Sequence, residues 1–268
     1  MWAVVNASVI GTSHGSSGAP CQDTSSILRF RIGDEDVLVA AIADGAGSAS
    51  HSQIGSSEAV QHLVKLVAQT DLVLTAVSIE QVRDWFGQVL AHLNTVAERE
   101  QIKITDLACI LLLSIVWKGG AIFSQLGDGA WVVEKEGTIA PGTWPENGEY
   151  ANVTVFITSP KALALTETGT LAHLQFNRVE GSIDAIAGFT DGIQSLVLKY
   201  ADKTAHAPFF SKMFQSLRAC TDETELITPL QQFLASDSVT TRTDDDKTLV
   251  LAVWREAEKV ANADGIPN

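Results

Sequence analysis

Positively charged residues are scarce in this 268-residue chain, where 18 lysines and arginines face 32 aspartates and glutamates, for a formal net charge of −14. A nucleic-acid-binding surface needs clustered basic side chains that displace counterions from phosphates, so we expect no nucleic-acid partner. Acidic side chains gathered in one place would instead attract cations. The positions of the aspartates therefore carry most of the functional information.

Cysteines and long apolar runs are also scarce. Cys21, Cys109 and Cys220 lie far apart without a Cys-x-x-Cys spacing, so the sequence predicts neither a disulfide framework nor a structural zinc site. The apolar runs at 37–43 and 108–117 are much shorter than the ~20 residues that a membrane helix needs. The first residues also lack the pattern of a secretory signal, and we expect a cytoplasmic protein without a membrane partner.

Hydrophobic periodicity predicts one α+β domain over residues 1–256, with largely antiparallel sheets and a layer of paired helices. Ser78 and Gln81 resemble a capping box at one helix start. Residues 136–182 form a less regular insert, and residues 257–268 a polar tail. Predicted strands cover 3–10, 25–32, 37–44, 107–117, 120–127, 130–135, 152–158, 183–190 and 247–254, and predicted helices cover 52–70, 78–102, 208–217 and 223–235.

Aspartate follows three of the predicted strands, and glycine follows each of these aspartates, at Asp44, Asp128 and Asp191. Glycine permits a turn with positive φ and lets the backbone approach a ligand closely. A single Asp-Gly pair is usually only turn chemistry. Three such pairs after buried strands, with the aspartate run 244–246 before the last strand, favour a cation site.

Antiparallel pairing would bring aspartates together, because an aspartate before one strand and an aspartate after its partner lie at the same sheet edge. Two carboxylates ~5 Å apart repel by about 3 kcal/mol at an effective dielectric of ~20, so such a cluster needs protons or cations. Oxygen ligands without thiolates favour Mg²⁺ or Mn²⁺ over zinc. The expected pairs are Asp23 with Asp44, Asp106 with Asp128, and, if the last two strands pair, Asp245 with Asp191.

Five blocks of the sequence, in their order and spacing, resemble the type 2C metal-dependent protein phosphatases over about residues 8–254. The pattern SH…PCQD resembles a bacterial subgroup of that family. The resemblance implies a four-layer α/β/β/α sandwich with two mainly antiparallel sheets flanked by helices. The blocks are SHGSSGAPCQD (13–23), AIADGAGSA (41–49), SQLGDGAW (124–131), GFTDGIQ (188–194) and DDDKTLVLAVW (244–254).

The same resemblance implies a centre of two or three Mg²⁺ or Mn²⁺ ions, with a metal-bridging water that attacks phosphorus directly. Asp44 would bridge two ions, and both Asp44 and Asp191 would be essential for catalysis. The implied ligands are Asp44, the Gly45 carbonyl, Asp191, Asp245 and, for a third ion, Asp128. Asp23, Gln22 and Asp246 would act from behind these ligands.

Several positions depart from the family pattern. The arginine that usually grips the substrate phosphate is replaced near His14, so His14 is expected to contact the phosphate and to take part in catalysis. Gln22 stands where an acidic residue is common, and Asp246 where asparagine is usual. Ala46 occupies the place of a histidine that often serves as general acid. Protonation of the leaving group would then fall to His14, His51 or a metal-bound water.

These features predict a metal-dependent serine/threonine phosphoprotein phosphatase, with a phosphoprotein as substrate and a serine/threonine kinase as a candidate partner. The departures at Gln22 and Ala46 motivate an alternative, a catalytically weak or inactive pseudophosphatase that binds a phosphoprotein or a kinase. The insert at 136–182 lies where the family carries a variable flap, so it would influence the choice of substrate.

Two other enzyme classes fit the sequence less well. A cysteine phosphatase would use Cys21, but the chain lacks that chemistry's phosphate loop of cysteine, five residues and arginine. A serine hydrolase would use Ser13, His14 and Asp23, but no Gly-x-Ser-x-Gly elbow accompanies them.

Overall fold

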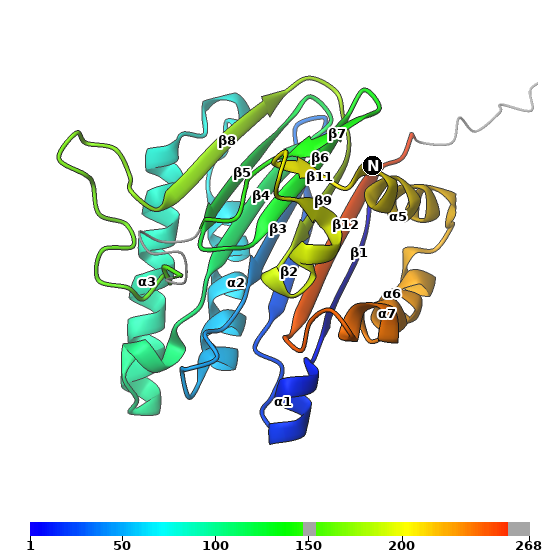
Figure 1. The fold of residues 1–268 in the computed structure, drawn as a ribbon. Coiled ribbons are helices and arrows are strands. Elements are labelled where there is room, and N and C mark those ends of the chain that lie inside the picture. Colours follow the sequence, from blue (N-terminus) through cyan, green and yellow to red (C-terminus); the bar gives the residue numbers. More distant parts are fainter. Residues whose placement is uncertain (147–153, 257–268) are drawn as a thin grey trace, which may run out of the picture.

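The computed structural model describes residues 1–146 and 154–256, and most of its strands form two five-stranded antiparallel sheets (Figure 1). One sheet has the order β1 (Trp2–Val9), β12 (Lys247–Trp254), β9 (Ile183–Phe189), β6 (Ala130–Lys135) and β7 (Thr138–Pro141). The other has the order β2 (Thr24–Ile32), β3 (Glu35–Ala43), β4 (Leu111–Trp117), β5 (Gly120–Leu126) and β8 (Leu174–Glu180). A short antiparallel pair is formed by β10 (Leu198–Lys199) and β11 (Thr204–Ala205).

Helices cover the outer faces of both sheets (Figure 1). On one side α2 (Ser52–Gln69) packs on β2 and β3, and α3 (Ile79–Glu100) packs against α2. On the other side α5 (Ala207–Ala219) contacts β12, and α6 (Ile227–Leu234) contacts β1. The predicted four-layer α/β/β/α sandwich is confirmed.

The remaining helices are short and lie in the connections between these elements. They are α1 (Thr12–Ser17), η1 (Leu74–Ala76), η2 (Ile104–Leu107), η3 (Asp191–Ile193), α4 (Gln194–Val197), η4 (Glu223–Leu226) and α7 (Asp237–Thr240). No helix within residues 1–146 and 154–256 combines the length and the apolar character that crossing a membrane requires.

Strand β3 shows how the sequence pattern builds the layers. Its side chains alternate between two faces, and both faces are buried. Leu38 and Ile42 join the core between the two sheets, whereas Val39 and Ala41 join the core beneath α2 and α3. An apolar run without polar alternation is therefore what this central strand requires.

The start of α3 shows one of the two hydrogen bonds of the predicted capping box. The Ser78 hydroxyl accepts a hydrogen bond from the Gln81 backbone N–H at 3.4 Å. This bond satisfies one of the amide groups that the first helical turn leaves without an intrahelical partner. The predicted helix of 78–102 is confirmed with bounds of Ile79–Glu100.

The insert at 136–182 is more regular than predicted, because it contains β7 and β8, which pair with β6 and β5. The predicted strand at 152–158 is wrong for residues 154–158, which are coil and turn, while residues 152 and 153 lie outside the described residues. The predicted polar tail at 257–268 also lies outside them. A single domain over residues 1–256 stays a prediction.

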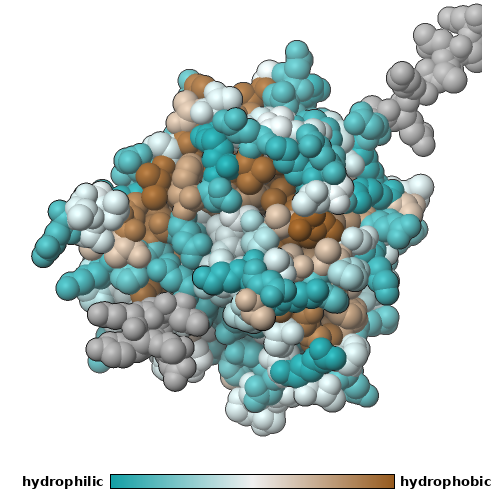
Figure 2. Space-filling model, turned by 45° about the horizontal axis from the view of Figure 1, so that its top comes forward, coloured by the Kyte–Doolittle hydropathy of each residue, from teal (hydrophilic) through white to brown (hydrophobic). Residues whose placement is uncertain are grey.

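The surface view in Figure 2 shows hydrophilic residues over much of one face, interrupted by separate apolar patches. Large apolar side chains with more than half of their area exposed include Val73, Leu165 and Tyr200, at 62%, 51% and 51%. These three residues belong to different connections of the chain, and scattered apolar residues of this kind are normal on a folded protein.

Candidate metal centre

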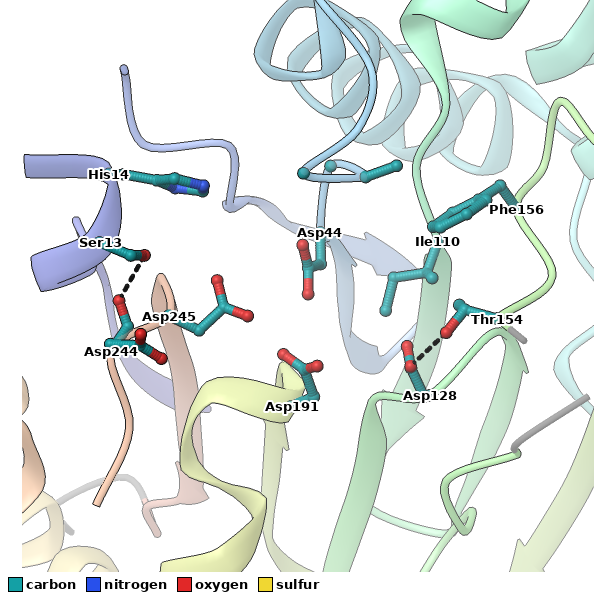
Figure 3. Close-up of a pocket in the computed structure, with 13 residues that line it drawn as sticks. Ser13, His14, Asp44, Ile110, Asp128, Thr154, Phe156, Asp191, Asp244 and Asp245 are labelled. Carbon is teal, nitrogen blue, oxygen red and sulfur yellow. Dashed lines mark hydrogen bonds between the residues drawn. The ribbon is translucent and has the colours of Figure 1, made fainter. Parts of the chain in front are cut away.

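A cavity of about 260 Å³ lies at the end of the sandwich where β3 and β9 end and β12 begins. Figure 3 shows Asp44, Asp191 and Asp245 directing their carboxylates toward a common space, with Asp128 beside Thr154. The described residues that line the cavity are Ser13, His14, Asp44, Gly45, Ala46, Gly47, Ile110, Asp128, Thr154, Phe156, Asp191, Asp244 and Asp245.

The strand registers explain why distant aspartates meet here. Thr24 pairs with Ala43, which places Asp23 next to Asp44 at one sheet edge, as the sequence predicts. Leu249 pairs with Phe189, so the residues before β12 and the residues after β9 share an edge in the other sheet. The expected pairing of β9 with β12 is confirmed, and it brings Asp245 to the same cavity as Asp191.

The expected pairing of Asp106 with Asp128 is wrong. The predicted strand at 107–117 begins only at Leu111, because residues 104–107 form η2. The Asp106 carboxylate accepts a hydrogen bond from the Lys103 backbone N–H at 3.1 Å and caps that short helix. Asp106 is not among the described residues that line the cavity.

Three carboxyls of the cavity, those of Asp44, Asp128 and Asp191, have pKa values above that of an ordinary aspartate. Burial raises the pKa of Asp44 well above its usual range, and the neighbouring carboxylates, led by Asp23 and Asp191, raise it further. Burial, with Asp128 and Asp245, raises the pKa of Asp191 to about 6. Burial also raises the pKa of Asp128, although the Thr154 hydrogen bond opposes the shift. Ionising the whole cluster at neutral pH therefore requires a compensating cation.

The donor set fits a hard divalent cation. The Oδ1 atom of Asp191 is buried without a hydrogen-bond partner among the described residues. No three of the described histidine, cysteine, aspartate or glutamate side chains already surround one point. Mg²⁺ usually binds one or two carboxylates and keeps several waters, so pairs of aspartates with the Gly45 carbonyl are sufficient. The expected ligands Asp44, Gly45, Asp128, Asp191 and Asp245 all line the cavity.

Asp23 lies behind Asp44 and does not line the cavity among the described residues. Its Oδ2 atom accepts a hydrogen bond from the Thr190 hydroxyl at 2.7 Å, and the Thr190 oxygen accepts one from the Thr248 backbone N–H at 3.0 Å. Burial raises the pKa of Asp23 to about 8, although the Thr190 bond opposes the shift. This burial is compatible with the predicted place behind Asp44, and the role of Asp23 in orienting water stays a prediction.

Asp246 and Gln22 connect the segments behind the cavity. The Asp246 carboxylate accepts hydrogen bonds from the Gly11 N–H at 2.6 Å, the Gln22 N–H at 2.6 Å and His14 Nδ1 at 2.9 Å. The Gln22 carbonyl in turn accepts the Gly45 N–H at 3.1 Å. Gln22 therefore positions the proposed carbonyl ligand through its backbone.

The glycines after the aspartates are required by close packing rather than by positive φ. A Cβ atom at Gly45 would lie 2.7 Å from the Ser52 Cβ, and one at Gly192 would collide with the Asp246 carbonyl oxygen. Positive φ occurs instead at Gly127, which precedes Asp128 and has φ of 110°. The expectation of positive φ at these glycines is wrong, and close approach of their backbone to a ligand stays a prediction.

The rival nucleophiles have no activating partners. Burial, with Asp246 and Asp23, raises the pKa of Cys21 to about 12, so its thiol is protonated at neutral pH. The Ser13 hydroxyl donates to the Asp244 carbonyl at 2.8 Å rather than to His14. Asp23 binds Thr190 and not His14, so the Ser13, His14 and Asp23 constellation of a serine hydrolase does not form.

Several residues at the site have no sequence signal of their own. Thr154 donates to Asp128 Oδ2 at 2.7 Å from within the insert, where the sequence predicts a strand. The Gln194 amide donates to the Asp128 carbonyl, and Gln194 falls in the GFTDGIQ block. Lys247 is fully buried, and its ammonium donates to the Asp245 carbonyl at 2.8 Å. The blocks at 188–194 and 244–254 contain Gln194 and Lys247 and could have directed attention to these two residues, but no block contains Thr154.

Comparison with known proteins agrees with this geometry. The family model described as Protein phosphatase 2C matches residues 10–235. The chain belongs to the protein phosphatase 2C family. Serine/threonine-protein phosphatase 3 of Escherichia coli (strain K12) is 37% identical to this phosphatase 2C chain over 272 residues, which cover 95% of the chain and 99% of the relative.

Solved bacterial structures share the protein phosphatase 2C fold. Serine/threonine phosphatase Stp1 from Staphylococcus aureus has a TM-score of 0.62 and 14% identity, with 96% of each chain covered. The S. agalactiae serine/threonine phosphatase has a TM-score of 0.62 and 15% identity, with 95% of this chain and 100% of that chain covered. The predicted type 2C family is confirmed, and the SH…PCQD subgroup stays a prediction.

Proposed function

We propose that this chain is an active, metal-dependent serine/threonine phosphoprotein phosphatase of the cytoplasm. The observation that supports the proposal most strongly is the convergence of Asp44, Asp128, Asp191 and Asp245 on one cavity. Burial raises the pKa of three of these carboxyls, Asp44, Asp128 and Asp191. Three free thiols are typical of proteins from a reducing compartment and support the location.

Two or three Mg²⁺ or Mn²⁺ ions are the proposed cofactors. When bound, they would acidify a water and neutralise charge on the phosphoryl oxygens. Asp44 and Asp191 would hold them from opposite sheets, with Asp245, Asp128 and the Gly45 carbonyl as further ligands. RsbX, solved in complex with magnesium, has the same fold with a TM-score of 0.53 and 12% identity, which supports this choice of cation.

The proposed reaction is direct attack of water on phosphorus, without a phosphoenzyme. The protonated Cys21 thiol and the Ser13 hydroxyl, which is bound to a carbonyl, support this route because neither is an activated nucleophile. In the cavity, His14 faces the space where the phosphoryl group would enter. The aspartates would orient the water and the phosphoryl group relative to each other.

The substrate is proposed to be a phosphoprotein, with a serine/threonine kinase as a candidate partner. Thr154 and Phe156 come from the insert and border the cavity, so this segment would contact residues around the phosphorylated side chain. That position supports the expected influence of the insert on substrate choice.

A pseudophosphatase remains the alternative function, because Ala46 lies in the cavity where the family's usual histidine would stand. The raised pKa values of Asp44 and Asp191 favour the active enzyme over this alternative. A module that only binds phosphoproteins has no need of carboxylates that destabilise one another.

The proposal is tested by hydrolysis of p-nitrophenyl phosphate with Mn²⁺, Mg²⁺ or EDTA. We expect metal-dependent turnover that Asp44→Asn reduces by at least about 10²-fold, because a ligand to the reacting centre is lost. Cys21→Ser is the matched control and should retain turnover. Wild-type activity in Asp44→Asn, or equal activity in EDTA, would exclude the proposed function.

A further inference from the structure

His14 is the only described residue lining the cavity that can carry a positive charge. The other titratable residues of this lining are carboxylic acids. The proposed function assigns all of them except Asp244 to cations. A phosphomonoester dianion in the cavity would therefore meet a single side chain of this lining whose protonated form is a cation. The titratable lining residues besides His14 are Asp44, Asp128, Asp191, Asp244 and Asp245.

The orientation of the His14 ring is fixed by a hydrogen bond to Asp246. Its Nδ1 atom lies 2.9 Å from Asp246 Oδ2, and the side chains of His14 and Asp246 are 18% and 2% exposed. A carboxylate only accepts hydrogen bonds, so Nδ1 carries the hydrogen. Asp246 is not among the described residues lining the cavity, which leaves Nε2, across the ring, for the cavity side.

Aspartate at 246 is what this arrangement requires. One carboxylate oxygen accepts the Gly11 N–H, while the other accepts both the Gln22 N–H and His14 Nδ1. Asparagine would replace one of the two oxygens with an NH₂ group, which donates hydrogen bonds and cannot accept them. One side of the group would then lose its bonds from the protein. All three bonds, including the one to His14 Nδ1, therefore need a carboxylate at position 246.

The other candidate proton donors either do not line the cavity or already donate their hydrogen to another group. His51 is the N-cap residue of α2, and its Nδ1 atom lies 2.9 Å from the Ser50 hydroxyl. His51 is not among the described residues lining the cavity. The Thr154 hydroxyl donates to Asp128, and the Ser13 hydroxyl donates to a carbonyl.

We propose that His14 is the general acid that protonates the leaving alcohol, and that Asp246 is the residue that positions it. This inference rests on the proposed function. As the water oxygen bonds to phosphorus, the bond from phosphorus to the seryl or threonyl oxygen breaks, and its electron pair stays on that oxygen. The oxygen takes the Nε2 proton to become an alcohol. One proton of the water remains on the phosphate, and the other returns to His14.

The leaving group provides the decisive test. A threonine alkoxide is a poor leaving group and needs a proton, whereas p-nitrophenolate delocalises its charge and leaves without one. With Mn²⁺ present, His14→Asn should lower kcat on a phosphothreonine peptide by about 10²-fold or more, the usual contribution of a general acid. The same variant should change kcat on p-nitrophenyl phosphate only slightly. Asp246→Ala, which removes both oxygens that could accept from His14, should show the same selectivity.

Ser16→Ala, an exposed position on the same helix α1, is the matched control and should hydrolyse both substrates like the wild type. Equal losses on both substrates in His14→Asn would overturn the inference, since His14 would then only bind phosphate. Unchanged hydrolysis of the phosphopeptide would overturn it as well. A wild-type protein that hydrolyses neither substrate would instead reject the proposed function together with the inference.

A second measurement does not depend on turnover. In ¹H–¹⁵N NMR spectra of the metal-free protein, the His14 ring is identified as the signal that His14→Asn removes. We expect its Nδ1 to be protonated in the wild type and to lose its hydrogen-bonded shift in Asp246→Ala, which removes both acceptor oxygens. An unprotonated Nδ1 in the wild type would contradict the proposed role of Asp246.

Discussion

At the scale of single residues, the raised pKa of the Asp191 carboxyl makes the stability of the folded protein depend on pH. Its pKa is raised from 3.8 to about 6, so the folded protein binds this proton more tightly than the unfolded chain does. Stability from this group is therefore present at low pH and is lost as the pH rises from about 4 to about 6. In the absence of metal, the Asp191 carboxyl therefore lowers the free energy of unfolding at neutral pH.

We expect metal-free Asp191→Asn to be more stable than the wild type at pH 8, by about 1–3 kcal/mol, because the buried charge is removed. The difference should shrink at pH 4.5, where the wild-type carboxyl is protonated. Urea unfolding in EDTA at both pH values measures it. Asp202→Asn, which removes an exposed carboxylate outside the cavity, is the control. A wild type more stable than Asp191→Asn at pH 8 would refute the electrostatic account.

Residue-level prediction from the sequence worked where a short turn fixes the register. The turn after Ile32 joins β2 to β3 directly, so the pairing of Thr24 with Ala43 and the meeting of Asp23 with Asp44 follow from chain geometry. Asp106 could not be placed in this way. Because the apolar run at 107–117 is continuous, the sequence does not show that η2 ends at Leu107. Only the structure shows that the Asp106 carboxylate caps this short helix.

At the scale of elements, periodic strands and helices were predictable, whereas the connections and the edge strands β7 and β8 were not. The bounds of β12 agree with the predicted 247–254 because the apolar run is continuous and begins after a block of charges. Strand β8 has several half-exposed and exposed residues, and its identity depends on pairing with the distant β5. The short helix α1 buries none of its residues, so no apolar stripe indicates it.

Two glycine substitutions should have opposite effects, depending on the element that contains each glycine. Gly192→Ala places a Cβ against the Asp246 carbonyl and should destabilise the protein by about 1–3 kcal/mol through overpacking. Gly87→Ala lies within α3, where an added Cβ meets nothing within 4 Å, and should stabilise it by about 0.5–1 kcal/mol. Thermal unfolding compares the two variants.

Gly47→Ala is a further control for this pair, because a Cβ there also meets nothing within 4 Å although the residue is near Asp44. Little change is expected in its melting temperature. If Gly192→Ala also melts like the wild type, the close approach of Gly192 to the β12 segment does not constrain the fold.

At the scale of the whole molecule, the proposed metal centre joins the two sheets. Asp44 follows a strand of one sheet, and Asp191 and Asp245 flank strands of the other. Asp128 lies where the chain passes from β5 in the first sheet to β6 in the second. Cations bound by these residues would offset the repulsion that opposes bringing the two sheet ends together.

The central claim is that these carboxylates hold the divalent cations on which phosphoester hydrolysis depends. The most direct test measures, on one preparation, the number of Mn²⁺ ions bound per chain by equilibrium dialysis and the turnover of a phosphothreonine peptide. We predict at least two bound ions and metal-dependent turnover in the wild type, with both reduced in Asp191→Asn. Bound Mn²⁺ without turnover would favour the pseudophosphatase, and turnover that persists in EDTA would contradict the account.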